Sequence, residues 1–518
     1  MKKLGLGIQE LSKFKENNLI YIDKTKIIHK LITSGTYYFL SRPRRFGKSL
    51  LVNTLEEIYS GNKELFTDTW IYDKWNFEDK YTVIKISFTE LSYYKQGLEQ
   101  ALELFLDEYA RKLNIKFIQP DYSGKFLELI EKLGKKKQVV ILIDEYDKPI
   151  IDFLEKDELE TAEKNRRILK NFYAGIKDMD KYIKFFFITG VSKFSQVSIF
   201  SDLNHLTDIT TAKDFSEIVG YTEKEIKDNY NEYLTQLTEN LELSKADLLK
   251  KIKLWYNGYS WDGKKFLYNP FSVLSLFFNK DFGNYWFETG TPTFLVKKIK
   301  ENGEPFSNFE KINVSKTSFN KYDIDNLNTT ALLFQTGYLT IKEYDPKRNK
   351  YLLDYPNKEV RDSLLLFSLN SYTNKEPALV ETIVDRLTAA LEETRIDDFM
   401  IELKALFESI PYKESEHIHN YEGYYHSIIY IALKIMGIYI ECEIMSSRGI
   451  TDAVIKTKKN IFVLEFKMGD AETAIKQIKD KKYYEPYVAD KREIILFGIG
   501  FDKEERNIKN YITETLNK

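Results

Sequence analysis

The most informative residues of this chain are three charged ones near the C-terminus, Asp452, Glu465 and Lys467. The apolar run 460–467 predicts a β-strand, in which residues i and i+2 share a face. Glu465 and Lys467 therefore point to one side of this strand, while Phe466 turns into the core. An acidic residue on a neighbouring strand, facing a Glu-x-Lys pair, predicts a divalent-cation site beside an ammonium group. Such a site has the groups needed to hydrolyse a phosphodiester bond.

This chemistry requires these residue types. Asp452, on the predicted hairpin partner 450–455, and Glu465 are hard oxygen ligands for Mg²⁺ or Mn²⁺, and the backbone carbonyl of Phe466 would add a third. The metal would polarise a phosphoryl oxygen and acidify a bound water, and Lys467 would position that water or stabilise the developing charge. The alternative is a hairpin with scattered surface charges, because 30% of the residues in the chain are charged.

Two predicted helices flank these strands. The upstream segment 422–437 has helical apolar periodicity and ends at a glycine. It carries Glu422, which would complete the metal shell through a water or would be an ordinary surface carboxylate. The downstream helix carries Gln477 and leads to Tyr483, and these two side chains would orient the site or contact the nucleic-acid backbone.

The order of these elements resembles the PD-(D/E)XK nuclease superfamily: a helix, a strand, a hairpin, the Glu-x-Lys strand and a second helix. The chain has Arg448-Gly-Ile-Thr-Asp452 where relatives commonly have Gly-Arg-x-Asp. The chain therefore lacks the Arg of that pattern but keeps the acidic ligand. The resemblance implies a divalent-metal-dependent nuclease.

A second motif lies near the N-terminus, where Ser41-Arg-Pro-Arg-Arg-Phe-Gly-Lys-Ser49 joins an apolar segment to the helical run 50–59. Strand, loop, Gly-Lys-Ser and helix form the architecture of a phosphate-cradling loop. Backbone N–H groups at the helix N-terminus would hold the phosphates, Lys48 would reach the β and γ oxygens, and the Ser49 hydroxyl would ligate Mg²⁺. Arg42 occupies the place of the first glycine of the usual pattern, and a basic surface turn that caps a helix is the alternative. The predicted nucleotide-binding residues of this loop are Arg45, Phe46, Gly47, Lys48, Ser49 and Leu50.

Two acidic residues support the nucleotide interpretation. Five consecutive apolar residues, 139–143, precede Asp144 and Glu145 and predict a buried parallel strand with carboxylates at its C-terminal end. Ligands bind at that end of the strands in an open α/β sheet. Asp144 would hold the water shell of Mg²⁺, and Glu145 would polarise the attacking water. A further strand ends near Thr189 and Ser192, which are either γ-phosphate sensors that contact the nucleotide or ordinary core residues.

Together these motifs resemble the AAA-ATPase-like family of bacterial and archaeal proteins that carry a C-terminal PD-(D/E)XK domain. The resemblance covers nearly the whole chain. It rests on residues 21–25, 42–49, 143–147, 188–194, 255–259, 288–290, 336–340, 355–357 and the nuclease-like end. The family has an arginine at the first glycine position of the loop, so Arg42 agrees with it.

The 518 residues predict about three domains. We expect an α/β protein with a doubly wound P-loop domain of the AAA type, a helical and winged-helix-like middle region, and a C-terminal α/β restriction-endonuclease-like domain. The expected segments are 1–212 for the ATPase, 213–375 for the lid and winged-helix-like region, 376–410 for a helical connector and 411–518 for the nuclease-like domain. Predicted strands 338–344 and 351–355 flank a basic turn, which would contact DNA or be a solvated wing tip.

Composition indicates the compartment and the partners to be expected for the protein. One cysteine, Cys442, excludes a disulfide framework and suits a reducing cytoplasm. The N-terminus lacks the apolar region of a signal peptide, and no apolar run approaches the roughly 18 residues of a membrane span. We therefore expect a cytoplasmic protein without a membrane partner. The net charge of −2 makes no case for nucleic acid, so any DNA surface must come from local patches.

These observations predict a P-loop ATPase fused to a metal-dependent nuclease, in which nucleotide state gates nucleic-acid binding or cleavage. ATP and Mg²⁺ are the expected cofactors, with Mn²⁺ an option in the nuclease site, and DNA is the expected partner. One alternative is a nucleotide-switched DNA- or partner-binding signalling protein with a non-catalytic nuclease-like domain. Another is a nuclease with a purely structural ATPase fold. The complete Asp452, Glu465 and Lys467 set favours chemistry, and the complete Gly-Lys-Ser and Asp-Glu motifs disfavour the last alternative.

Proteins of the AAA type often complete their site with an arginine from a neighbouring subunit, which predicts a homo-oligomer. Arg166 and Arg167, on the predicted helix 163–170, are candidates for that arginine. An ordinary exposed position on a helix is the simpler interpretation of both.

Overall fold

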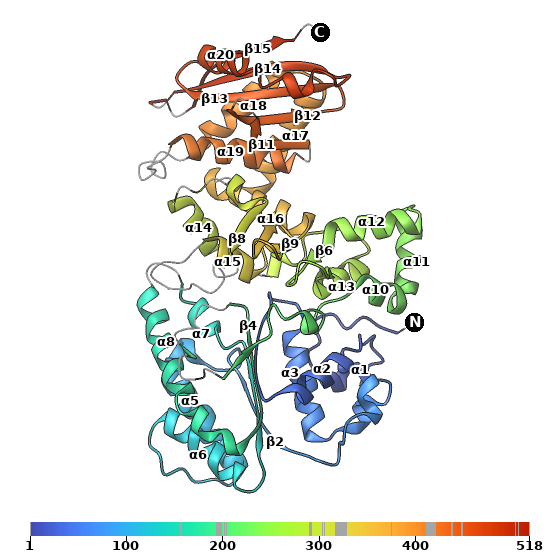
Figure 1. Ribbon diagram of the computed structural model, residues 1–518, viewed down its shortest axis with the longest axis vertical. Coiled ribbons are helices and arrows are strands. Elements are labelled where there is room, and N and C mark those ends of the chain that lie inside the picture. Colours follow the sequence, from blue (N-terminus) through green and yellow to red (C-terminus); the bar gives the residue numbers. More distant parts are fainter. Residues whose placement is uncertain are drawn as a thin grey trace. The chain divides into compact units, whose positions relative to one another are not determined.

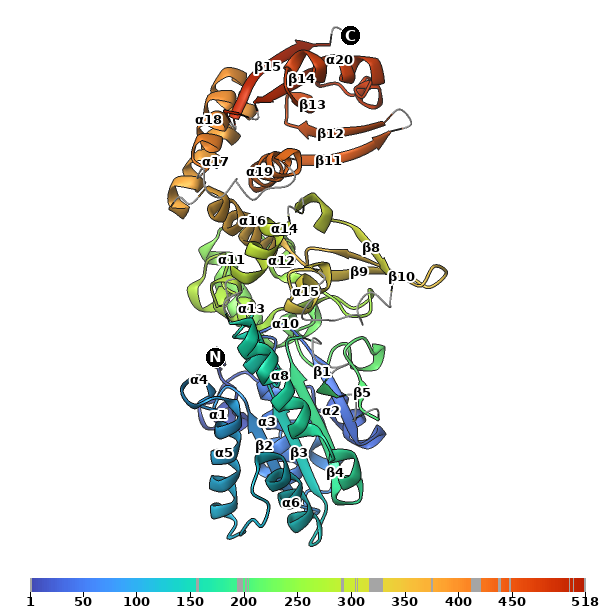
Figure 2. The same ribbon diagram turned by 90° about the vertical axis from the view of Figure 1, so that its left-hand side faces the viewer.

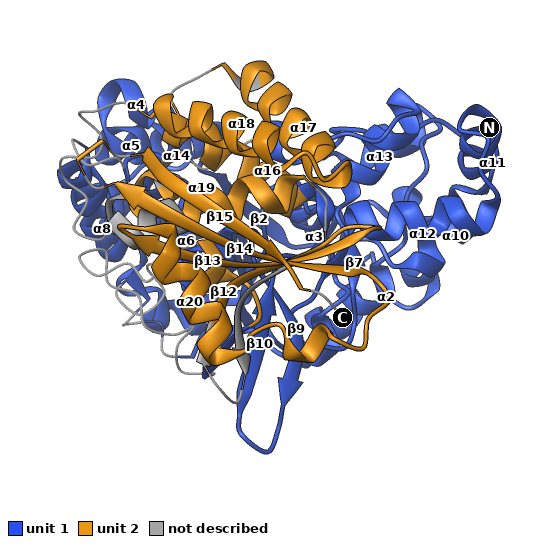
Figure 3. Cartoon of the chain, turned by 90° about the horizontal axis from the view of Figure 1, so that it is seen from above, with its two compact units in different colours: residues 1–291, 312–359 blue, residues 292–311, 360–518 orange. Residues whose placement is uncertain are grey.

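The fold is that of a computed structural model. It describes residues 2–154, 158–192, 199–200, 203, 205–289, 293–302, 304, 306–315, 329–373, 376–410, 421–436, 439–446, 449–502, 504–505 and 507–516. Of these, the backbone alone is described for residues 289, 293–294, 301–302, 377, 421–426, 439–446 and 449–450. The chain forms two compact units (Figure 3). Unit 1 comprises Met1–Thr291 and Ile312–Glu359, and unit 2 comprises Pro292–Lys311 and Val360–Lys518.

Unit 1 is built on a parallel sheet. Its strand order is β2 (Thr82–Ser87), β3 (Val139–Asp144), β4 (Ile183–Gly190), β1 (Tyr37–Ser41) and β5 (Thr207–Asp208). All six residues of β3 are buried, as expected for a strand covered on both faces. On one side lie α1 (Leu11–Glu16), α2 (Thr25–Ser34) and α3 (Lys48–Ser60), and on the other α5 (Leu98–Lys112), α6 (Tyr122–Gly134) and α8 (Leu159–Tyr173) (Figure 1). The predicted doubly wound α/β class is confirmed.

The parallel register brings the ends of the strands together. Ser41 of β1 pairs with Gly190 of β4, and Asp144 of β3 pairs with Ser87 of β2. The loops that follow these strands therefore meet at one edge of the sheet, where ligands bind in folds of this kind. Two short helices, α4 (Tyr93–Gln96) and α7 (Lys148–Ile151), follow the ends of β2 and β3.

The second part of unit 1 is mainly helical. It contains α10 (Glu223–Asn229), α11 (Asn231–Asn240), α12 (Lys245–Tyr256) and α13 (Pro270–Asn279), with a ribbon of β6 (Asn257–Tyr259) and β7 (Leu267–Tyr268). A capping box starts α10, because Thr222 accepts from the backbone N–H of Glu225 and the Glu225 side chain accepts from that of Thr222. Buried residues of these helices form one apolar core with Ile20 and Ile22 from the N-terminal segment.

A three-stranded antiparallel sheet completes unit 1. Its order is β8 (Ile312–Ser315), β10 (Lys350–Asp354) and β9 (Thr340–Asp345), and α15 (Thr329–Thr336) precedes β9. The predicted hairpin is therefore present, and its turn spans residues 346–349. Asn349 adopts a left-handed conformation there, with φ of 50°, which asparagine tolerates better than most residues.

Unit 2 joins helices to a second sheet (Figure 2). The helices are α14 (Thr293–Asn302), α16 (Lys358–Thr373, whose first two residues belong to unit 1), α17 (Pro377–Glu392), α18 (Ile396–Glu408), α19 (Tyr421–Ile435) and α20 (Ala471–Lys481). The sheet runs β11 (Tyr439–Ser446), β12 (Gly449–Lys456), β13 (Asn460–Met468), β14 (Glu493–Asp502) and β15 (Asn507–Thr515). Only the β13–β14 pair of this sheet is parallel, because α20 makes the crossover between them.

The apolar core of this sheet domain lies under α20. Ile475 and Ile478 of α20 pack with Val463 of β13 and Leu496 of β14. The order of helix, three strands, helix and strand agrees with the predicted restriction-endonuclease-like domain, whereas the finer division of the chain into four segments stays a prediction. Among the described residues, none of the helices has the length and apolar character needed to cross a membrane.

Candidate functional site

The loop between β1 and α3, residues 42–47, is called here the phosphate loop. Two of its residues adopt left-handed backbone conformations, Arg45 with φ of 62° and Gly47 with φ of 93°. Left-handed residues in such a loop turn backbone N–H groups toward a common centre, which is how proteins build concave anion sites. Helix α3 starts directly after Gly47 and adds the positive end of its dipole. The backbone is therefore suited to hold phosphate oxygens.

Lys48 lies at the first position of α3 and is nearly fully buried. Its Nζ donates hydrogen bonds to the carbonyl oxygens of Arg42, at 3.0 Å, and Pro43, at 2.9 Å. Burial lowers the pKa of Lys48, while the carboxylates that follow the apolar part of β3 act to raise it. The ammonium group is thus placed between the phosphate loop and those carboxylates.

Asp144 is the last residue of β3 and is buried. Burial raises its pKa to about 6, although a hydrogen bond with the Ser49 side chain and the charge of Lys48 act in the other direction. Its Oδ1 is buried and has no hydrogen-bond partner among the described residues. An unsatisfied carboxylate oxygen beside a serine hydroxyl is a donor set that suits Mg²⁺, and the predicted ligands Ser49 and Asp144 therefore fit this ion.

Glu145 follows Asp144 with φ of 53°, a left-handed conformation that costs a non-glycine residue about 1 kcal/mol or more. The hydroxyl of Thr89, directly beyond β2, donates a hydrogen bond to its carboxylate. Sequence reasoning missed Thr89. The available signal was its position two residues after a strand that neighbours β3 in a parallel sheet.

The two predicted γ-phosphate sensors are bonded within the fold. The Thr189 hydroxyl donates to the carbonyl of Leu40 at 2.8 Å, and the Ser192 hydroxyl donates to Asp147 at 2.7 Å. Asp147 also accepts from the backbone N–H groups of Val191 and Ser192, so it ties the end of β3 to the end of β4. Val191, directly after β4, lines the cavity that is described next.

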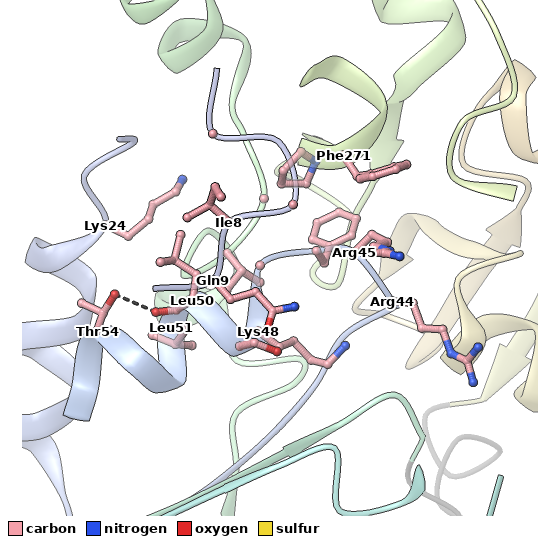
Figure 4. Close-up of a pocket in the computed structure, with 18 of the residues that line it drawn as sticks. Ile8, Gln9, Lys24, Arg44, Arg45, Lys48, Leu50, Leu51, Thr54 and Phe271 are labelled. Atoms are coloured by element: carbon pink, nitrogen blue, oxygen red, sulfur yellow. Dashed lines mark hydrogen bonds between the residues drawn. The ribbon is translucent and has the colours of Figure 1, made fainter. Parts of the chain in front are cut away.

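A cavity of about 400 Å³ lies against the phosphate loop (Figure 4). The six predicted loop residues all line it: Arg45, Phe46, Gly47, Lys48, Ser49 and Leu50. Figure 4 shows Ile8 and Gln9 from the N-terminal segment and Phe271 from α13 on other sides of the same space. Tyr21, Ile22 and Lys24, which precede α2, also contribute to the lining. A basic loop at one end and a mixture of apolar and polar side chains elsewhere match the polarity of a nucleotide.

Two residues of the phosphate loop, Arg42 and Phe46, pack against residues outside the loop. The guanidinium of Arg42 is fully buried, lies 3.9 Å from the centre of the Trp261 ring and donates to the Thr210 carbonyl at 2.9 Å. Burial lowers its pKa to about 9. The ring of Phe46 packs edge-on against Tyr259 and Trp261, at 4.9 and 5.2 Å between ring centres. Arg42 therefore acts as an anchor where the usual loop has a glycine.

The second candidate site lies on β12 and β13. Asp452 accepts a hydrogen bond from the backbone N–H of Phe466 at 2.7 Å, which fixes the carboxylate beside β13. Glu465 is 1% exposed, and Lys467 donates to its Oε1 at 2.9 Å, so the two share a face as predicted. Gln477, on α20, also donates to that oxygen and lies 3.3 Å from the hydroxyl of Tyr483. The structure thus brings together five residues that the sequence placed in this site: Asp452, Glu465, Lys467, Gln477 and Tyr483. Tyr483 was expected on the same helix as Gln477, but α20 ends at Lys481 and Tyr483 follows it.

The electrostatics of this site favour a cation. Burial and the charge of Asp452 raise the pKa of Glu465 to about 7, against the opposing effect of Lys467. Its Oε2 is buried and has no hydrogen-bond partner in the described part of the chain. The side chain of Glu422, on α19, lies outside the described residues, as does Arg448. Within the described ranges no three His, Cys, Asp or Glu side chains form a metal cluster. Asp452 and Glu465 are the two predicted ligands that the described side chains supply here, and the role of Glu422 stays a prediction.

Comparison with known proteins covers both sites. Residues 5–200 match a family described as "Predicted AAA-ATPase", and residues 420–511 match the "PD-(D/E)XK nuclease superfamily". The chain is 36% identical over 526 residues to a protein of Azotobacter chroococcum mcd 1 described as "Uncharacterized protein in vnfD 5'region", and the match covers 99% of both chains. No solved structure matches the chain.

Proposed function

The chain belongs to the AAA-ATPase-like family with a C-terminal PD-(D/E)XK nuclease superfamily domain, and from this premise we propose that it is an ATPase whose nucleotide state gates cleavage of nucleic acid. The proposed substrate of the second activity is DNA. One observation carries the proposal for both sites. Asp144 and Glu465 are buried carboxylates, and each has a buried oxygen without a hydrogen-bond partner among the described residues. A buried carboxylate is stable only when hydrogen bonds or a cation compensate for lost water, so both sites call for a divalent ion.

At the first site, the phosphate loop binds ATP. Its backbone N–H groups and the start of α3 hold phosphate oxygens, and Lys48 exchanges its carbonyl partners for the β and γ oxygens. Mg²⁺, held by Ser49 and Asp144, would neutralise charge on the phosphates. Glu145 accepts a proton from the attacking water, and Thr89 orients that carboxylate.

At the second site, β12 and β13 present the reacting groups on one face. A divalent cation held by Asp452, Glu465 and the Phe466 carbonyl would polarise the scissile phosphate and acidify a water. Lys467 orients the water and offsets negative charge that develops on the phosphate. Gln477 fixes the rotamer of Glu465 through the bond to Oε1.

A second candidate function is a nucleotide-switched binding protein with a non-catalytic nuclease-like domain. The observation that favours it is the ligand count, because the described residues supply no third carboxylate or imidazole. A site with two carboxylates binds a divalent ion more weakly than one with three, and a switch protein needs no bound ion there.

One experiment separates the two functions. The full-length protein is incubated with labelled DNA and with labelled RNA, with and without Mg²⁺ or Mn²⁺ and with and without ATP, beside the variants Glu145→Gln and Asp452→Ala. We expect metal-dependent cleavage of DNA that Asp452→Ala abolishes and that ATP modulates. Glu145→Gln should bind ATP without hydrolysing it. Failure to cut either nucleic acid with either metal, together with intact ATP hydrolysis, would assign the protein to the switch class.

A further inference from the structure

Trp286 contacts the phosphate loop from a segment more than two hundred residues away in the chain. Its indole Nε1 donates a hydrogen bond to the carbonyl of Arg44 at 3.0 Å. The indole is buried and packs against Tyr338 and Tyr259, with ring centres 5.2 and 6.3 Å apart. Because Arg44 lines the cavity, this bond restrains the backbone of the loop at a residue that borders the cavity.

The backbone of Trp286 makes a second polar contact. Its N–H donates to Oε1 of Glu359 at 2.7 Å, and the hydroxyl of Ser272 donates to Oε2 at 2.8 Å. Glu359 is fully buried and forms no ion pair with the described residues. Ser272 lies on α13, next to Phe271, which lines the cavity. One buried acid therefore joins α13, which lines the cavity, to the segment of Trp286, which contacts the phosphate loop.

Glu359 also occupies a particular place in the chain. It is the second residue of α16 and the last residue of unit 1, and the helix continues as the first part of Val360–Lys518 in unit 2. Glu359 therefore lies in the first turn of that helix, where side-chain hydrogen bonds help to fix how the helix starts.

We propose that Trp286 is a positioning residue that couples the phosphate loop to α16 through Glu359. This inference rests on the proposed function and names the route by which nucleotide reaches unit 2. Phosphate binding orders the loop and fixes the position of the Arg44 carbonyl. The hydrogen bond from the indole of Trp286 to that carbonyl then fixes the tryptophan. The backbone N–H of Trp286 in turn holds the Glu359 carboxyl group at the start of α16. Hydrogen bonds inside a buried network strengthen one another, so loss of one contact weakens the whole path.

The chain offers a matched control for Trp286. Trp75 is also packed among aromatic rings, against Tyr59 and His29, but its buried Nε1 has no hydrogen-bond partner in the described part of the structure. Replacement by phenylalanine removes the same atoms at both positions. Only the change at Trp286 removes a bond to the phosphate loop.

The test measures hydrogen exchange at the amides of residues 360–373 in the full-length protein, with and without a non-hydrolysable ATP analogue, while calorimetry measures binding of the same analogue. In the wild type and in Trp75→Phe, the analogue should slow exchange in this segment. In Trp286→Phe and in Glu359→Met, which removes both acceptor oxygens, the slowing should be lost. Analogue affinity should fall by roughly tenfold at most in Trp286→Phe, as expected for one neutral hydrogen bond.

The outcomes separate this inference from the function on which it rests. Analogue binding with no effect on residues 360–373 in the wild type, or with full slowing retained in both Trp286→Phe and Glu359→Met, overturns the coupling and leaves the ATPase proposal standing. A wild-type protein that binds no nucleotide overturns both. If Trp286→Phe does not fold, the Glu359→Met variant decides alone, because methionine keeps the approximate size of the side chain and removes the acceptor of the Trp286 N–H.

Discussion

The hydroxyl of Thr89 donates a hydrogen bond to the carboxylate of Glu145 across the ends of two neighbouring parallel strands. Thr89→Val keeps the shape of the side chain and removes this donor. We expect ATP affinity to stay near the wild-type value and kcat to fall by about 10- to 100-fold, because the carboxylate loses its orientation toward water. Thr89→Ser, which keeps a hydroxyl, should retain most of the rate. Steady-state ATP hydrolysis with a separate binding measurement checks this, and an unchanged kcat in Thr89→Val would exclude an orienting role.

Lys48 supplies the buried cation of the phosphate loop. Lys48→Ala should weaken ATP binding by about 10- to 100-fold, because it removes charge-assisted hydrogen bonds to the phosphates. Lys30→Ala is the control, since Lys30 is half-exposed and pairs with Asp214 on the surface. Calorimetry with ATP and with adenosine compares the two. Equal loss of affinity for adenosine would place the defect in the fold and not at the phosphates.

The residues on β12 and β13 have separable roles. Asp452→Ala and Glu465→Ala should each weaken Mn²⁺ binding and abolish cleavage, because each removes a metal ligand. Lys467→Ala should leave Mn²⁺ binding intact and lower the cleavage rate by about 100-fold or more. Lys459→Ala, in the exposed turn before β13, is the control. Mn²⁺ titration beside a cleavage assay distinguishes the roles, and normal cleavage by Lys467→Ala would contradict this assignment.

Glu359 predicts a pH dependence of stability. Burial raises its pKa from 4.5 to about 8, and the charge of Glu288 acts in the same direction. The folded state therefore keeps a proton that the unfolded state loses above about pH 4.5, so this contribution to stability is full at low pH and is lost as the pH rises through about 8. Glu359→Gln stays neutral in both states. Its melting temperature relative to the wild type should therefore rise between pH 5 and pH 8, and a constant difference would show that Glu359 is ionised in the fold.

Nucleotide should also promote self-association. Half-buried Arg166 and exposed Arg167 lie on α8, and an arginine from a second copy would complete the charge around the γ-phosphate. We expect Glu145→Gln to form a dimer or larger assembly with ATP and Mg²⁺, measured by light scattering. Replacing both arginines by alanine should prevent this. A constant mass with and without ATP would count against a shared site.

Continuous apolar runs made much of the fold predictable. The strand ending in Asp144 and the strand carrying Glu465 could be placed because apolar residues fill each run and a polar pair marks its end. The hairpin before Glu465 followed from a polar turn between two such runs. Local patterns also placed Lys48 at a helix start. These features depend on neighbours in sequence.

Contacts between distant segments could not be predicted in this way. Arg42 looked like a substitution for a glycine, whereas its partner is Trp261, more than two hundred residues later. Ser192 follows the end of β4 by two residues, and its hydroxyl is bonded to Asp147 of another loop. Nothing in the pattern around Trp286 marks it as a partner of the phosphate loop. Such contacts arise from tertiary packing between distant residues, and the local patterns of a single sequence do not reveal them.

The two compact units are interleaved along the chain, since Pro292–Lys311 of unit 2 separates the two parts of unit 1. During synthesis, unit 1 lacks the sheet of β8, β9 and β10 until Glu359 has left the ribosome. By then the first part of unit 2, Pro292–Lys311, has already left the ribosome and cannot pack until Val360–Lys518 has been synthesised. Domains generally fold as units in the order of synthesis, so this arrangement delays completion of the first unit and exposes an unpaired segment meanwhile. A fragment that ends at Thr291 would carry the whole phosphate loop and still be an unfinished unit.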